Sequence, residues 1–347
     1  KDLLALHASF AQLPLLKLKL QSVASSEMLK DILKIETFDL LKQELKAAIK
    51  EDTNNNIREG GVIAVGYNSE LDSLLTITRD SKQILQKHGF KQIICLEKNI
   101  SLNDDFDQTR IIIEKYDIDI VIVDKYGPKL KKTYLSKIKK IAKLVLVTDL
   151  DKKDFPADLI INGFIGFQNK IIFNKYNAKC LLGPKYQILN KNFSKKIKLP
   201  KKNIILATFG GFDENNINEF LMNILQKYSK QIKCKFILGP VRSSSKNKLM
   251  KKFHGCDFKI ISDTKNMYSE ISNVRFGFCS GGITSYEFAS LGKPFAIISQ
   301  VKHQLKTAKE WEKKGLAINL GMFNLKKKNQ IENILKKLIS DQNPIKI

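Results

Sequence analysis

The chain has 347 residues, of which 43% are hydrophobic, so it is long enough for two or three domains with buried cores. Its five scattered cysteines form no C-x-x-C pair, so neither a disulfide framework nor a cysteine zinc site is expected, and we expect the chain to reside in a reducing cytoplasm. No apolar run approaches the roughly 18 residues that span a bilayer, so no membrane span is expected. The net charge of +25 suggests nucleic-acid binding, but only five of the 60 basic residues are arginines, the side chain best suited to reading bases.

The first 86 residues differ from the remainder in charge and in pattern. They hold 11 basic and 12 acidic residues, a net charge of −1, so the remaining 261 residues hold 49 and 23, a net charge of +26. Apolar residues at helical spacing predict helices over most of 1–50, a polar turn follows over 51–61, and helical spacing returns over 70–85. We expect a boundary at residue 86. The chain shows no signal peptide, and it begins with lysine and not with methionine, which is typical of a fragment.

From residue 87 onwards, short β-branched runs alternate with amphipathic helices, which is the pattern of a parallel sheet. In a domain over 87–198, strands are predicted at 92–96, 118–124, 143–149, 158–162 and 179–183, and helices at 106–116 and 131–142. In a domain over 199–347, strands are predicted at 203–209, 233–239, 258–262, 275–279, 294–299 and 316–320. The predicted fold class is α/β, with two Rossmann-type domains behind a helical segment.

Two glycine pairs follow predicted strands of the last domain, and each is expected to open a helix. Gly210 and Gly211 follow the strand at 203–209, and Gly281 and Gly282 follow the strand at 275–279. Such turns bring backbone amides and a helix N-terminus to a phosphate, and ligands of open parallel sheets bind at the carboxyl ends of strands. The two turns face one crevice if their strands are neighbours.

The residues after the second glycine pair leave two interpretations open. Thr284 and Ser285 are expected in the first helical turn, where their hydroxyls can donate to a diphosphate, and Glu287 can accept hydrogen bonds from a ribose diol. Thr284 and Glu287 also have the spacing of a capping box, so capping and packing explain them as well. His303 and Gln304 are expected at the start of a later helix on the same side of the sheet, although a lone histidine is also an ordinary surface residue.

Five stretches of the basic part together resemble one family: TFGGFDENN, FILGP, SGGITSYEFASLGKP, HQLKTAKEWEKKG and LLGPKYQILNKNF. It is the family of PseG, the UDP-sugar hydrolase of the pseudaminic-acid pathway, with the SpsG-like spore-coat polysaccharide glycosyltransferases. The resemblance covers about 87–340. It implies a glycosyltransferase-B-type pair of Rossmann-type domains, similar to the MurG group, in which the C-terminal domain binds UDP without a metal or cofactor.

The resemblance also implies roles for particular residues. The glycine turns and Thr284 face the diphosphate, Glu287 takes the ribose, and His303 and Gln304 lie near the sugar or diphosphate. Four residues of the preceding domain lie on that domain's side of the cleft, although each has an equally good structural explanation; they are Asp124, Tyr126, Asp149 and Tyr186.

One departure from the family affects catalysis. Family members begin with a strand and a G-x-G-H turn whose histidine is the expected catalytic base, and this sequence contains no such turn. We therefore expect the first βαβ unit to be missing, so that the first Rossmann-type domain is incomplete and has an exposed apolar edge. The chain is expected to retain a UDP-binding half-site, to lack the residue that performs the chemistry and to be catalytically impaired.

Residues 1–86 resemble the core and lever region of the mismatch-repair ATPase MutS, through KDLLALHASFAQLPLLKLKL and AIKEDTNNNIREGGVIAVGYNSELDSLLTITRDSKQIL. They contain neither a mismatch-reading domain nor a P-loop. An in-frame fusion, a deletion product or an assembly error explains the chain most simply, and a two-function protein is the alternative. The expected function is UDP-sugar hydrolysis or transfer in surface-polysaccharide or nonulosonic-acid biosynthesis; DNA binding by the MutS-like part and a non-catalytic remnant are the alternatives.

Overall fold

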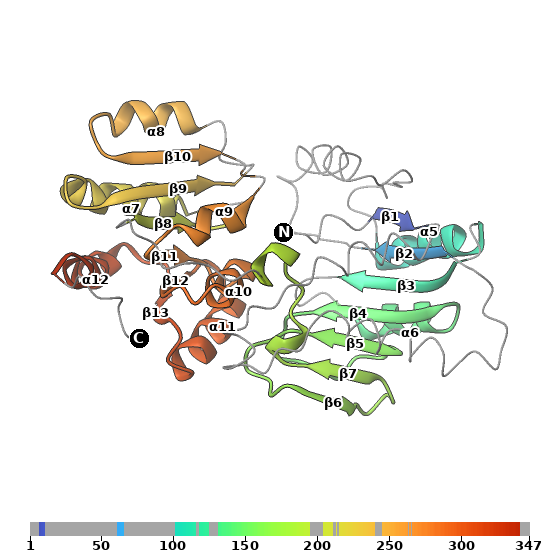
Figure 1. Cartoon of the computed structure of the whole chain (residues 1–347). Helices are drawn as coiled ribbons and strands as arrows, with labels where there is room; N and C mark the ends of the chain where they lie inside the picture. Colours follow the sequence, from blue (N-terminus) through green and yellow to red (C-terminus); the bar gives the residue numbers. More distant parts are fainter. Residues whose placement is uncertain are drawn as a thin grey trace. The chain divides into compact units, whose positions relative to one another are not determined.

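The computed structural model of the chain describes residues 7–10, 61–65, 101–115, 118–124, 131–194, 204–210, 213, 215–239, 245–262, 264 and 266–340. The described residues form two α/β units, one ending at Ile188 and the other beginning at Leu189, and each unit contains one sheet (Figure 1). None of the described helices combines the length and apolar character that a membrane crossing requires.

The first sheet has seven strands in the order β1-β2-β3-β4-β5-β7-β6. They are β1 (His7–Phe10), β2 (Gly61–Val65), β3 (Ile118–Asp124), β4 (Lys143–Thr148), β5 (Leu159–Asn162), β6 (Lys170–Phe173) and β7 (Lys179–Leu182). Strands β2, β3, β4, β5 and β7 run parallel, whereas β1 and β6 are antiparallel edge strands. Helices α5 (Leu102–Lys115) and α6 (Lys132–Lys139) join β3 and β4 in one buried apolar cluster that includes Val121, Leu135 and Leu144.

Strands β1 and β2 correct the expectation for the front segment. The sequence predicts helix around residues 7–10, but β1 pairs antiparallel with β2, with Ala8 opposite Ala64. Pairing with a neighbouring strand overrides the local helical spacing. Strand β2 in turn pairs parallel with β3, with Ile63 beside Val121, so the β3 edge that was expected to be exposed is covered. The other helices predicted over 1–86, and the strand predicted at 92–96, lie outside the described residues.

The remaining elements of the first unit follow the predicted pattern with shifts of a few residues. Helix α5 begins at Leu102, four residues before the predicted start, because Ser101 and Asp104 form a capping box: the Ser101 hydroxyl accepts from the Asp104 amide at 3.1 Å, and Asp104 Oδ2 accepts from the Ser101 amide at 3.3 Å. Strand β6 was not predicted. It forms a hairpin with β7 and is largely exposed, so it lacks the apolar pattern of a buried strand.

The second sheet has six parallel strands in the order β10-β9-β8-β11-β12-β13. They are β8 (Ile204–Thr208), β9 (Lys233–Leu238), β10 (Phe258–Ser262), β11 (Phe276–Cys279), β12 (Phe295–Ser299) and β13 (Ile318–Met322). All six were predicted, β13 two residues too early. This is the strand order of a doubly wound sheet, in which the direction of winding reverses between β8 and β11.

Helices cover both faces of this sheet. Apolar residues of α7 (Ile217–Leu225), α8 (Lys246–Lys252) and α12 (Lys328–Ser340) share a buried cluster with one set of alternating strand residues, including Ile205 and Phe236. The alternate positions of the strands contact α9 (Met267–Ser272), α10 (Ile283–Ser290) and α11 (Lys302–Lys313). The short turn η4 (Lys191–Ser194) also contacts α10.

Helix α10 approaches β11 closely because Gly277 has no side chain. A Cβ at Gly277 would overlap the ring of Phe288. Phe288 stacks on Phe295 of β12 with ring centroids 5.7 Å apart, and Trp311 of α11 meets Phe295 and Tyr286 edge-on at 5.8 and 5.1 Å. These aromatic rings are buried. They fix α10 and α11 on the sheet and therefore set where the two helices begin.

Gly277→Ala is expected to lower the free energy of unfolding by about 1–3 kcal/mol, because the added methyl forces the Phe288 ring and α10 to move. The same change is expected to cost much less in a Phe288→Leu background, where the smaller side chain leaves room. Urea denaturation of the two single variants and the double variant measures this coupling. Additive effects of the two substitutions would contradict the close contact between α10 and β11.

Candidate functional site

The two predicted glycine turns follow neighbouring strands. Strands β8 and β11 pair directly, with Thr208 in register with Cys279, and the winding of the sheet reverses between them. Gly210 follows β8, and Gly281 and Gly282 follow β11, so both turns lie at the edge where open α/β sheets bind ligands. The two strands are therefore neighbours, as is required for the two turns to face the same place at the sheet edge. Gly211 lies outside the described residues.

Helix α10 begins immediately after the second glycine pair. Its N-cap residue is Gly282, which supplies no capping side chain, and Thr284 is already the second residue of the helix and is buried. The capping box that the spacing of Thr284 and Glu287 suggested is therefore not formed. The first amides of a helix lack intrahelical partners and carry partial positive charge, so this N-terminus is suited to an anion.

Helix α7 differs from α10, which corrects the expectation that the first glycine turn opens directly into a helix. It begins only at Ile217, and the buried Asp213 carboxylate occupies its N-terminus. Asp213 Oδ1 accepts from the Ile217 amide at 2.7 Å, and Oδ2 accepts from the amide and the Nδ2 of Asn218 at 3.1 and 3.0 Å. An anion at this turn would therefore meet the loop backbone around Gly210 and not the start of α7.

The three described glycines of the two turns differ in whether, and why, the structure requires glycine at that position. Gly210 has φ of +79°, in the left-handed region that favours glycine. A Cβ at Gly281 would lie 2.7 Å from the backbone oxygen of Gln304, so packing against α11 requires glycine there. A Cβ at Gly282 would meet only the Ser280 hydroxyl, at 4.0 Å. Packing within the described residues does not require glycine at position 282. Close approach of a ligand to the backbone would require it.

Ser285 and Glu287 of α10 have different surroundings. The Ser285 hydroxyl is fully buried; it donates to the Gly282 carbonyl at 2.7 Å and accepts from Trp311 Nε1 at 3.0 Å. Its hydrogen bonds are therefore made within the protein, and the structure gives it a packing role. Glu287 is half-buried, and its charge adds to burial in raising the pKa of the Cys279 thiol. Glu287 therefore lies near the carboxyl end of β11.

His303 and Gln304 lie in the first turn of α11, after β12. Burial lowers the pKa of His303 to about 4, so the imidazole is neutral at pH 7. A neutral imidazole can donate a hydrogen bond to a phosphate, or donate to or accept from a sugar hydroxyl, but it brings no positive charge. Gln304 Oε1 accepts from the Gln300 amide at 2.8 Å, so this oxygen closes the turn that precedes α11.

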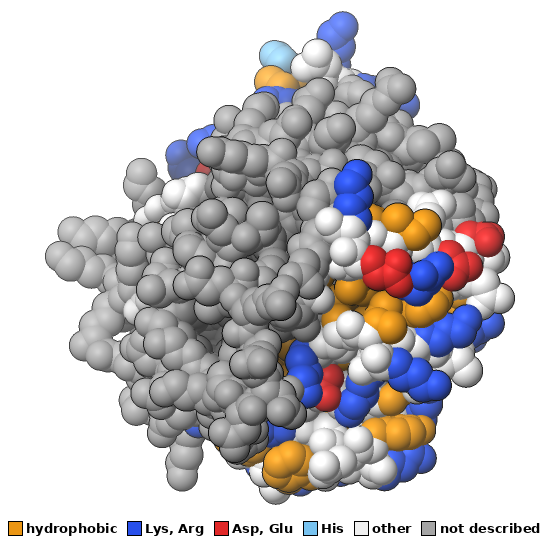
Figure 2. Space-filling view, turned by 90° about the vertical axis from the view of Figure 1, so that its right-hand side faces the viewer, with side chains coloured by type: hydrophobic (Ala, Val, Ile, Leu, Met, Phe, Trp, Pro, Cys, Tyr) orange, Lys and Arg blue, Asp and Glu red, His pale blue; other side chains and the backbone are white. Residues whose placement is uncertain are grey.

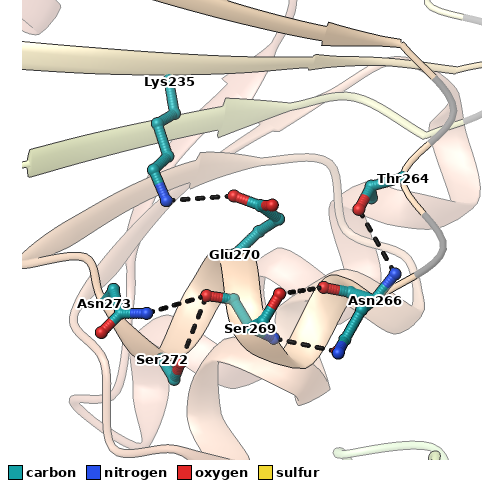
Figure 3. A network of polar contacts seen from close by, with 7 residues as sticks. All are labelled: Lys235, Thr264, Asn266, Ser269, Glu270, Ser272 and Asn273. Carbon is teal, nitrogen blue, oxygen red and sulfur yellow. Dashed lines mark hydrogen bonds and ion pairs between the residues drawn. The ribbon is translucent and has the colours of Figure 1, made fainter.

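A polar network that was not predicted holds α9, the helix that contacts α10 (Figure 3). Lys235 of β9 lies 3.0 Å from the carboxylate of Glu270 in α9, and the two side chains are only 15% and 17% exposed. Asn266 caps the helix by accepting from the Ser269 amide at 3.1 Å. Because the loss of one partner from a mostly buried ion pair is costly, this pair fixes α9 on β9.

The predicted residues of the first unit lie at the carboxyl edge of its sheet or in its core. Asp124 ends β3, and Asp149 follows the neighbouring β4. Burial raises the pKa of the Asp149 carboxyl. Tyr186 is buried in the short turn η3 (Pro184–Tyr186), with the Lys185 ammonium 5.5 Å from its ring centroid. Tyr126 and the side chain of Asp124 lie outside the described parts of the structure.

Two asparagines that the sequence did not single out fix the loop that carries Asp149. Asn162 Nδ2 and Asn174 Nδ2 each donate to two backbone carbonyls of this loop at 2.8 and 2.9 Å; the acceptors are Leu150 and Lys152 for Asn162, and Lys153 and Phe155 for Asn174. In sequence, such asparagines indicate only a local turn. Among the described residues, no group of three His, Cys, Asp or Glu side chains is placed to hold a metal ion.

The face shown in Figure 2 carries no continuous basic surface in its described part. Lysine and arginine side chains alternate there with acidic and hydrophobic ones. Some basic residues are also paired, as in the 2.9 Å contact between Arg110 and Glu114. On this face the positive charge is spread out, which is not the pattern of a dedicated nucleic-acid surface.

No family model matches the chain. The chain is similar to the spore coat polysaccharide biosynthesis protein SpsG of Bacillus subtilis, with 27% identity over 227 residues, which are 61% of this chain and 65% of SpsG. A different similarity, to the DNA mismatch repair protein MutS of Caldicellulosiruptor bescii, has 38% identity over 93 residues, which are 26% of this chain and 11% of MutS. The chain thus spans less than two thirds of either relative, and it matches two different proteins, as the two resemblances predicted.

Among solved structures, MurG of Acinetobacter baumannii is similar, with a TM-score of 0.50 over 77% of this chain and 82% of MurG, at 14% identity. At that identity the similarity concerns the fold alone. Together with the two largely parallel sheets, it confirms the predicted glycosyltransferase-B-like pair of Rossmann-type units.

The free energy of unfolding is expected to fall as the pH decreases from about 6.5 to about 4. An unfolded histidine has a pKa of about 6.5 and binds a proton that folded His303, with a pKa of about 4, excludes. The stabilisation is fully present above pH 6.5 and is lost progressively below it, by up to about 3 kcal/mol. Urea denaturation across this pH range measures the effect.

His303→Gln is expected to flatten this pH dependence. The matched control is His254→Gln, at an exposed position, which is expected to keep the parental profile. Identical profiles for the parent and for His303→Gln would show that His303 is not responsible.

Proposed function

We propose that this chain binds UDP or a UDP-sugar at the carboxyl edge of its second sheet, as a glycosyltransferase-like protein of surface-polysaccharide or nonulosonic-acid biosynthesis. The observation that carries the proposal is the Gly281–Gly282 turn, which leads directly into α10 where the winding of the sheet reverses. The similarity to SpsG, whose name refers to spore coat polysaccharide biosynthesis, supports the choice of a sugar nucleotide.

The diphosphate is assigned to the amides at the start of α10. Open space at the position of a Gly282 Cβ lets a phosphate oxygen approach the backbone, and the helix N-terminus favours its negative charge. The Gly210 turn follows the neighbouring strand and contributes backbone from the other side of the reversal point. Ser285 has no part in this assignment, because its hydroxyl is bonded inside the protein.

The ribose is assigned to Glu287. One helical turn, about 5.4 Å along the axis, separates Glu287 from the start of α10, so its charge stands apart from the phosphates while its two oxygens can accept from a diol. His303, which is half-buried and neutral at pH 7, and Gln304 are assigned to the sugar or diphosphate. Neither assignment requires a metal ion or a cofactor.

The proposal is limited to binding. The 347 residues contain no G-x-G-H turn, so no catalytic base is assigned. The MutS similarity spans 11% of MutS and contributes no mismatch-reading function to the proposal. A chain that joins a MutS-like front segment to a sugar-nucleotide-binding part accounts for both similarities.

Gly282→Ala is expected to weaken UDP binding at least tenfold, because its new methyl occupies the space assigned to a phosphate oxygen. The same change is expected to alter the free energy of unfolding by no more than about 1 kcal/mol. Gly281→Ala is the matched control and is expected to destabilise the fold itself, since its Cβ meets the Gln304 backbone. Calorimetric titration and thermal denaturation with and without UDP separate the two effects.

In the parent, UDP at a hundredfold excess over its Kd should add about 2.7 kcal/mol to the free energy of unfolding. A parent that UDP does not stabilise would overturn the proposed function. Equal UDP affinity in the parent and in Gly282→Ala would instead overturn only the assignment of the diphosphate to α10.

Glu287→Ala is expected to weaken UDP binding about tenfold, because hydrogen bonds between a carboxylate and the ribose hydroxyls are lost. It should weaken the binding of 2′-deoxy-UDP much less, since that ligand already lacks one of the hydroxyls. Titration of both ligands against the parent and the variant gives the coupling between carboxylate and hydroxyl. Equal losses for the two ligands would remove Glu287 from the ribose site.

A further inference from the structure

Gln300 links two strand ends that are not neighbours. It follows β12 directly, and its Nε2 donates to the carbonyl of Phe209, which follows β8 directly, at 2.7 Å. Strand β11 lies between β8 and β12, so the outer two strands are about 10 Å apart. The Gln300 side chain therefore spans the end of β11, from which the Gly281–Gly282 turn emerges.

Gln300 is itself held by α11, the helix that follows it. Its backbone amide donates to Gln304 Oε1 at 2.8 Å. The backbone oxygen of Gln304 lies 2.7 Å from the position of a Gly281 Cβ, so the second glycine turn packs directly on the same helical turn. We call Gln300, Phe209, Gly281 and Gln304 together the glutamine clamp. It joins the loops after β8, β11 and β12.

The glutamine clamp sets the orientation of the peptide group between Phe209 and Gly210. The carbonyl and the amide of a planar trans peptide point in opposite directions, so a carbonyl that faces Gln300 directs the Gly210 amide away from it. Gly210 then turns the chain with φ of +79°. A turn that is held in one conformation before a ligand arrives binds that ligand more tightly, because less ordering accompanies binding.

We propose that Gln300 is a positioning residue for the diphosphate: it holds the first glycine turn in a fixed relation to the second. This inference rests on the proposed binding of UDP. Gln300 acts through the Phe209 carbonyl and does not itself contact the ligand, so its effect should depend on whether the ligand carries phosphates.

The test compares Gln300→Leu with Gln226→Leu in the full chain. Gln226 is the matched control, since its Nε2 also donates to a backbone carbonyl, that of Asn223, at 3.0 Å near the end of α7. UDP and uridine are titrated against each protein and followed by NMR. Gln300→Leu is expected to weaken UDP binding about tenfold and to leave uridine binding unchanged. The control is expected to bind both ligands as the parent does.

Each other outcome has one meaning. A Gln300→Leu chain that binds UDP as tightly as the parent overturns the positioning role. Equal losses for UDP and uridine also overturn it, because they indicate a general structural effect. A parent that binds neither ligand overturns the proposed function instead. Gln300→Met, which is neutral, similar in size and offers no hydrogen-bond donor, serves the same comparison if Gln300→Leu fails to fold.

Discussion

The pairing of β8 with β11 is the constraint on which the candidate site depends. These strands are separated in sequence by two strand–helix units, yet Thr208 and Cys279 are in register, so the chain segments that leave them start side by side. Gly277 then lets α10 pack against β11, and the Phe288–Phe295–Trp311 cluster fixes where α10 and α11 begin. Backbone pairing and aromatic packing thus bring together the two glycine turns, which lie far apart in the sequence.

The two helices that follow these strands show how one architecture provides different chemistry. At α7 the protein supplies its own anion, the buried Asp213 carboxylate, to the helix N-terminus. At α10 the N-cap is a glycine with open space beside it. A single carboxylate therefore decides which of two similar turns remains suited to a negatively charged ligand.

Much of the fold was predictable, because buried parallel strands are short β-branched runs such as IDIVIVD and FAIIS. Strand β6 escaped prediction because it is exposed, and β1 because its partner lies far along the chain. The glycine turns were visible from their spacing. Asp213 was missed although it caps α7 from only four residues before Ile217, and Gln300 was missed because its partner Phe209 lies far away in the sequence. Ser285 was misleading for the same reason: its partner Trp311 is on another helix. The ligand-binding roles assigned to the glycines, Glu287 and His303 remain predictions.

The ladder between β2 and β3 gives the front segment a place in the first sheet. Hydrogen bonds in such a ladder join main-chain groups and depend little on side-chain identity, so a run as short as GVIAV can pair with β3 and continue the sheet toward β1. For the β3 amides that face β2, protection from solvent exchange then comes from residues that precede the compositional break at residue 86, whereas β4 protects the others. Two stretches with different sequence relatives would in this way open and close as one cooperative element.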